Sequence, residues 1–67
     1  IDVRQMEMPK PMMTILEALD VLADDQALYV YHKRIPVFLL PELQERKFDY
    51  RIKKIGDGEV YLLIFKP

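Results

Sequence analysis

The sequence predicts an α/β (α+β) two-layer sandwich, in which two helices cover one face of a mixed four-stranded sheet. Hydropathy alternates with a period of two in residues 1–4 and again in residues 48–55, which is typical of half-buried strands. Between these segments, apolar residues recur every three or four positions, which is typical of amphipathic helices. The segment order is β-α-β-α-β-β. Right-handed crossovers then place both helices on the same face of the sheet.

The first strand is expected at residues 1–4, and residues 1–8 are expected to run extended into a helix that begins at Pro11. Proline suits the first helical position, because its φ is preset and the amide it lacks would be unpaired there. The residue before each of Pro9 and Pro11 is also held extended. We expect a helix of about 13 residues. Its apolar stripe consists of Met12, Ile15, Leu16, Leu19, Leu22 and Ala23.

The second strand and the second helix follow. Residues 27–31 are rich in β-branched and aromatic side chains, which favour a strand. Pro36 can open a helical segment, but Pro41 in a helix interior would remove a hydrogen bond. The sequence therefore predicts a short turn at residues 36–39 and a helix at residues 40–47.

The C-terminal part predicts a hairpin. Residues 48–55 and 60–65 have the composition of strands, and Gly56-Asp57-Gly58 between them offers glycine where φ can be positive. There is no repeat, no low-complexity segment and no linker, so residues 1–67 are expected to form a single domain.

Composition excludes several classes of function. Ten basic and eleven acidic residues give a net charge of −1, whereas a nucleic-acid module carries a basic surplus on one face. The chain has no cysteine, which excludes disulfides, thiolate zinc sites and persulfide chemistry. It also has no serine nucleophile and no glycine-rich phosphate loop, so we expect no enzymatic activity. No apolar run approaches the roughly 20 residues of a membrane span, and we expect a cytoplasmic protein without membrane partners.

The order and spacing of the prolines resemble those of the TusA/SirA-like sulfur-carrier family. The resemblance covers essentially the whole chain and rests on Met8-Pro9-Lys10-Pro11, His32-Lys33-Arg34-Ile35-Pro36-Val37 and Leu40-Pro41-Glu42-Leu43. It implies the fold described above. The carriers hold a persulfide on the cysteine of a Cys-Pro-x-Pro motif, and Met8 occupies the corresponding position here. The chain resembles a cysteine-lacking, uncharacterised branch of that family. Methionine cannot ionise, so the resemblance implies the scaffold without sulfur relay.

One candidate site lies where both predicted helices begin. Parallel first and second strands would end at one edge of the sheet, and helix N-termini at such an edge favour anions. The sequence therefore predicts a site for an anionic group or an acidic partner. Its residues are Met8, Lys10, His32, Lys33 and Arg34. The alternative is a solvated basic loop without a ligand, because runs of charge are most often plain surface.

A second reading of this edge is a soft-metal or haem site. His32 is the only histidine, and Met6, Met8, Met12 and Met13 are nearby in the sequence. Histidine and methionine together suit soft metals and haem iron. However, Met12 lies on the apolar stripe, where methionine is more often core filler, and no metal-ligand spacing is present. We therefore expect no cofactor.

The sheet face away from the helices predicts an interface. Alternation places an apolar or aromatic set on that face: Tyr29, Tyr31, Tyr61, Leu63 and Phe65. Arg4, Arg51 and Lys53 are expected around it. Uncovered sheet faces normally carry polar residues, so an apolar set indicates contact with another protein or with an identical copy as a dimer. The alternative is that tyrosines tolerate water and the long cations cover the remainder.

Overall fold

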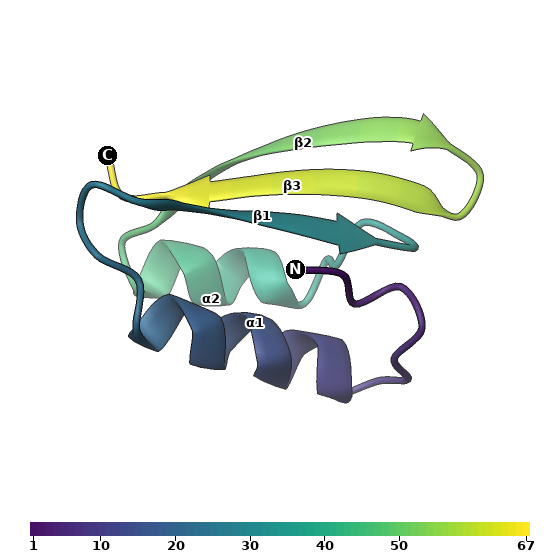
Figure 1. The fold of residues 1–67 in the computed structure, drawn as a ribbon, viewed down its shortest axis with the longest axis horizontal. Coiled ribbons are helices and arrows are strands. Elements are labelled where there is room, and N and C mark those ends of the chain that lie inside the picture. The colour runs from purple at the N-terminus through teal and green to yellow at the C-terminus, as the bar shows by residue number, and fades with distance from the viewer.

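A computed structural model describes residues 1–67 and shows two helices packed on one face of a three-stranded antiparallel sheet (Figure 1). The elements are α1 (Lys10–Asp20), β1 (Ala27–His32), α2 (Leu39–Glu45), β2 (Asp49–Gly56) and β3 (Glu59–Phe65). The strand order is β1-β3-β2, and β3 pairs antiparallel with both neighbours. The predicted two-layer α+β architecture is confirmed at this level.

The predicted fourth strand is not formed, so the sheet is not the mixed four-stranded one expected. Residues 1–3 do lie beside β1, where the Tyr31 N–H donates to the Ile1 carbonyl and the Val3 N–H donates to the Tyr31 carbonyl, both at 2.9 Å. This contact amounts to one parallel bridge, between Asp2 and Tyr31. Asp2 Oδ1 then accepts the Arg4 backbone N–H at 3.0 Å. That local bond competes with strand pairing and turns the chain away after Val3.

Helix α1 begins one residue earlier and ends earlier than predicted. Pro9 precedes its first turn, and Pro11 is buried at its second position. Ile15 and Leu19 are also buried, as the apolar stripe predicts. The helix has 11 residues. The Val21 and Leu22 N–H groups that follow it donate to the carbonyls three residues back, at Ala18 and Leu19, which is the 3₁₀ pattern and ends the α-helix. Leu22 therefore packs against the core from outside the helix.

Pro41 lies in the first turn of α2 and not in the helix interior, where it would remove a hydrogen bond. The first amides of a helix have no partner, so the missing N–H costs nothing there. The predicted end at residue 47 is wrong, because Lys47 has φ 65°. The Phe48 N–H donates to the Leu43 carbonyl at 2.9 Å, and the Lys47 N–H donates to the Gln44 carbonyl at 3.0 Å. These two bonds form a Schellman motif that ends the helix.

The predicted hairpin is confirmed. Strands β2 and β3 are joined at Asp57-Gly58, and Gly58 has φ 73°, which a side chain would disfavour. The pairing register shifts between Lys54 and Gly56.

The core lies between the sheet and the helices and follows the predicted alternation. Its nine buried apolar residues come from every element except β2: Val3, Ile15, Leu19, Val30, Leu39, Leu43, Val60, Leu62 and Ile64. Strand β2 contributes half-buried side chains, Tyr50 and Ile52. Val3 is fully buried although no strand contains it, so residues 1–3 complete the core without extending the sheet.

Candidate functional site at the helix-start end

Both helices begin at the end of the molecule where β1 finishes, as Figure 1 shows. Residues 33–38 connect β1 to α2 at this end. A pocket of about 130 Å³ opens there between the start of α1 and the connection. Most of its lining is apolar, and its two polar residues both belong to the predicted site. The lining residues on which its chemistry depends are Met8, Met12, His32, Arg34, Val37 and Phe38.

His32 is buried, with 1% of its surface exposed. It is the last residue of β1 and follows Leu28 and Val30 on the face that meets the helices. Its Nδ1 accepts a hydrogen bond from the Arg34 backbone N–H at 3.3 Å. No hydrogen bond within the chain reaches Nε2, yet no buried side-chain nitrogen or oxygen lacks a partner. Nε2 is therefore the part of the ring that remains accessible, and the pocket is where it opens.

The charge state of His32 follows from this position. Burial lowers its pKa below 6.5, and the charges of Arg34 and Lys33 lower it further. The ring is therefore neutral at pH 7. Because Nδ1 accepts a hydrogen bond, the neutral ring carries its proton on Nε2. His32 thus presents an N–H donor to the pocket rather than a positive charge.

Arg34 is the one arginine without an ion pair inside the chain. Each of the other three contacts a carboxylate: Arg4 contacts Asp2, Arg46 contacts Asp20, and Arg51 contacts Asp49. Arg34 is exposed and lines the pocket together with His32. The pocket therefore combines apolar walls, the neutral Nε2–H donor of His32 and a guanidinium without an ion pair.

The far side of the sheet carries a cluster of aromatic rings. The three tyrosine ring centroids lie 4.7–5.6 Å apart, within the range of favourable aromatic pairs. Arg4 lies 5.7 Å from the Tyr31 ring, and Arg51 lies 5.5 Å from the Phe65 ring. Tyr29 is 44% exposed and Leu63 is 38% exposed. We call this surface the tyrosine face and define it as Tyr29, Tyr31, Tyr61, Leu63 and Phe65.

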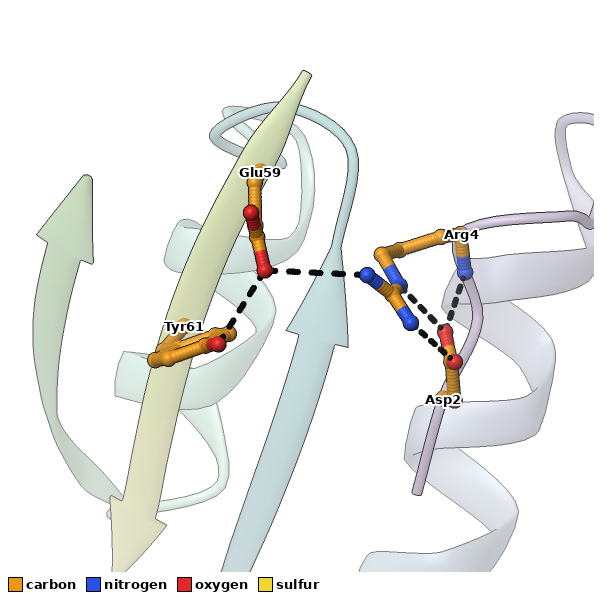
Figure 2. A network of polar contacts seen from close by, with 4 residues as sticks. All are labelled: Asp2, Arg4, Glu59 and Tyr61. Atoms are coloured by element: carbon orange, nitrogen blue, oxygen red, sulfur yellow. Dashed lines mark hydrogen bonds and ion pairs between the residues drawn. The ribbon is translucent and has the colours of Figure 1, made fainter. Parts of the chain in front are cut away.

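A polar network at one end of the tyrosine face ties the N-terminal segment to β3 (Figure 2). The Arg4 guanidinium donates to both carboxylate oxygens of Asp2, at 3.0 and 2.8 Å, and lies 3.7 Å from Glu59 Oε1. The Tyr61 hydroxyl donates to the same Glu59 oxygen at 3.1 Å. The hydrogen bonds from Arg4 lower the pKa of Asp2 to about 2, and the bond to Glu59 raises the pKa of Tyr61. The network reaches across β1 from Arg4 to Glu59. It therefore holds residues 2–4 to the sheet beyond the single bridge between Asp2 and Tyr31.

Comparison with known protein families gives a match over almost the whole chain. A family model described as an uncharacterized conserved protein, DUF2249, matches residues 1–66. The chain belongs to the DUF2249 family. No curated protein and no solved structure matches it. The family match does not link this DUF2249 domain to the TusA/SirA-like carriers.

The structure brings together three of the five residues predicted for the helix-start site. Met8, His32 and Arg34 share the pocket, whereas Lys10 is not part of the lining. Lys33 instead borders a neighbouring hollow, which Arg34 also lines together with Lys54 and the hairpin turn. Arg34 is therefore the one predicted cation that reaches the pocket beside His32, and it stands between the two hollows.

The start of α1 is also a poorer anion site than a typical helix N-terminus. Pro9 and Pro11 have no N–H, the Lys10 N–H donates to the Glu7 carbonyl at 3.0 Å, and the Met13 N–H donates to the Pro9 carbonyl at 3.2 Å. Few amides remain free to bind an anion. The prolines that fix where α1 begins also remove its donors.

The apolar walls of the pocket do not follow from the sequence. Its pattern places Met12 on the apolar stripe of the first helix and places Val37 and Phe38 in the predicted turn at residues 36–39. Val37 is 61% exposed and Phe38 is 75% exposed. Two consecutive apolar residues in a predicted loop were the available signal.

No group of three or more histidine, cysteine, aspartate or glutamate side chains could hold a metal ion. Neither helix has the length and apolarity that crossing a bilayer requires.

Proposed function

We propose that this DUF2249 domain is a non-catalytic binding domain that takes a small chemical group into the pocket beside His32. The observation that carries the proposal is a buried imidazole whose single uncommitted nitrogen opens into an apolar pocket. This Nε2–H is the one polar position of the ring that no group of the chain occupies, so it is free to donate to a ligand.

The four methionines provide a direct test. Met8 and Met12 line the pocket, whereas Met6 and Met13 do not, so the second pair is an internal control. The protein is labelled with ¹³C at the methionine methyl groups and titrated with small amphipathic probes such as isobutanol, isovaleramide and isovalerate. We expect the Met8 and Met12 signals to move while those of Met6 and Met13 stay in place. If no probe at millimolar concentration moves Met8 or Met12, the proposal is wrong.

Two other readings of this end are less well supported. Sulfur relay would need a nucleophile where Met8 stands, and a thioether has no proton to lose. A metal bound at Nε2 would need the proton on Nδ1, and that nitrogen already accepts the Arg34 N–H. We retain the TusA-like relationship as a proposal about ancestry, supported by the proline pattern, together with a cytoplasmic location.

A second proposed role is self-association through the tyrosine face. It is supported by the exposure of Tyr29 and Leu63 on an uncovered sheet. The arginines of this face are already neutralised, Arg4 by Asp2 and Glu59, and Arg51 by Asp49. Of the three cations around this face, Lys53 alone has no ion pair and lies beside Tyr61. The charge that two copies would bring together is therefore limited, and we propose a second copy of the chain as the partner.

A further inference from the structure

The composition of the pocket narrows the class of ligand. The walls contributed by Met8, Met12, Val37 and Phe38 are apolar, so the enclosed part of the ligand is apolar as well. A cavity of about 150 Å³ holds a benzene molecule, and this pocket has about 130 Å³. The ligand body that fits is therefore a short hydrocarbon group of roughly four to six carbons.

The polar groups narrow the class further. His32 presents Nε2–H, which needs an acceptor, and Arg34 presents a guanidinium without an internal partner. A carboxylate supplies two acceptor oxygens and a negative charge, and its planar shape matches the guanidinium. A phosphate is a poorer fit, because it favours several cations and free helix amides. Lys10 and Lys33 lie outside the lining, and the prolines deplete the amides of α1.

We infer that the pocket binds a small carboxylate with a short apolar body, its carboxylate held by the Arg34 guanidinium and Nε2–H of His32 and its hydrocarbon part enclosed by the methionine and loop side chains. The inference rests on the proposed function and adds the ligand class to it. The same chemistry occurs in a free short-chain acid and at a peptide C-terminus that ends in an apolar residue.

The experiment compares probes of one shape. Isovalerate and isovaleramide share one shape, but the amide is neutral and has an NH2 donor in place of one acceptor oxygen. Acetate keeps the charge but lacks the apolar body. With Met8 and Met12 methyl shifts as the readout, we expect isovalerate to bind about tenfold more tightly than isovaleramide, because its carboxylate accepts charge-assisted hydrogen bonds. We expect a similar margin over acetate, because acetate has no apolar body to fill the pocket. Equal affinities for isovalerate and isovaleramide would overturn the carboxylate inference while leaving the proposed function intact. Absence of binding by every probe would overturn both.

Matched variants test the two residues. Arg34→Gln and His32→Phe should each weaken isovalerate binding about tenfold. Arg34→Gln should leave the affinity for the neutral isovaleramide nearly unchanged. Arg51→Gln is the control, because Arg51 is exposed on the other face and pairs with Asp49. Arg34 is exposed, so its variant should keep the fold even if His32→Phe does not. If Arg34→Gln binds isovalerate like the wild type, the inference is wrong.

Two further readouts complete the test. A bound carboxylate near His32 should raise the pKa of its imidazole, which the ring C–H signals report in a pH titration with and without isovalerate. No change in that titration at saturating isovalerate would contradict the contact with His32.

The peptide acetyl-Gly-Gly-Val distinguishes the two possible sources of the carboxylate, a free short-chain acid and a peptide C-terminus. If the peptide binds more tightly than isovalerate, the ligand is the C-terminus of a partner protein. If the peptide binds more weakly, the ligand is a free acid.

Discussion

The backbone N–H of Arg34 donates a hydrogen bond to Nδ1 of the buried His32 across the end of β1. This contact fixes which ring nitrogen carries the proton, and it directs the other nitrogen to the pocket. It also carries the chain from β1 into the loop that forms the pocket wall. One hydrogen bond between residues two apart thus sets both the chemistry and the shape of the candidate site.

His32 should make the stability of the fold depend on pH. Its folded-state pKa is lowered by burial and by Arg34 and Lys33, so the unfolded chain binds the proton more readily. The free energy of unfolding should therefore fall as pH drops below about 6.5, until pH passes the folded-state pKa. Urea denaturation between pH 7.5 and pH 5.5 measures this slope. His32→Phe should flatten it, and an unchanged slope in that variant would contradict the assignment.

Replacing Lys47 with glycine should stabilise the protein. Lys47 has φ 65° at the end of α2, a conformation that costs a non-glycine residue about 1 kcal/mol. We expect Lys47→Gly to raise the free energy of unfolding by about 1 kcal/mol and the Tm by several degrees. Lys47→Ala is the control, because alanine keeps the strain. Equal stability of the two variants would show that the backbone here is not strained.

The N-terminal segment should be essential to the core although it forms no strand. Val3 is fully buried in the core, whereas Ile1 is 45% exposed. Val3→Ala should lower the free energy of unfolding by about 2 kcal/mol through lost burial and a residual cavity. Ile1→Ala should change it by less than about 0.5 kcal/mol. Chemical denaturation compares them, and similar losses in both would contradict the burial of Val3.

The Asp2–Arg4 contact should be visible as an acidic titration. The pKa of Asp2 is lowered to about 2, so the contact is complete above about pH 4 and is lost as pH falls through 2. Carboxyl ¹³C chemical shifts should place the Asp2 midpoint there. Arg4→Gln should return it towards 3.8 and speed hydrogen exchange at the Val3 amide. A midpoint that Arg4→Gln does not change would mean that another group lowers the pKa.

The tyrosine face should control association. Tyr29→Lys adds an unpaired charge at the most exposed tyrosine of that face, and it should convert a dimer to a monomer in sedimentation velocity experiments. Val21→Lys is a matched control, because Val21 is 84% exposed at the end of α1. A wild-type chain that sediments as a monomer at micromolar concentration would exclude the second copy and leave a different partner for this face.

The sequence was a good guide to elements with local causes. Apolar period, paired prolines and the Gly56-Asp57-Gly58 turn identified both helices, the hairpin and the two sheet faces. Boundaries were less accurate where a side chain or a strained residue intervened. Asp2 ends the N-terminal extended segment by capturing the Arg4 N–H, and Lys47 ends α2 without the glycine that usually marks such a place. Neither effect has a periodic signal.

The candidate site, like the fold, was predictable from the sequence only in part. The sequence alone determined that Arg34 lies between a strand and a helix and that no thiol is available at the Met8 position. It predicted a strand ending at residue 31, whereas β1 continues to His32. Only the tertiary structure decided that His32 turns into the core while Lys10 and Lys33 remain outside the pocket. The physical reason is that β1 has a side-chain period of two, which groups His32 with Leu28 and Val30 once β3 and the helices fix which face is buried. The charged residues near a helix start can be read from the sequence. The burial of the His32 ring depends on β3 and the helices, which pack against β1 from distant parts of the chain.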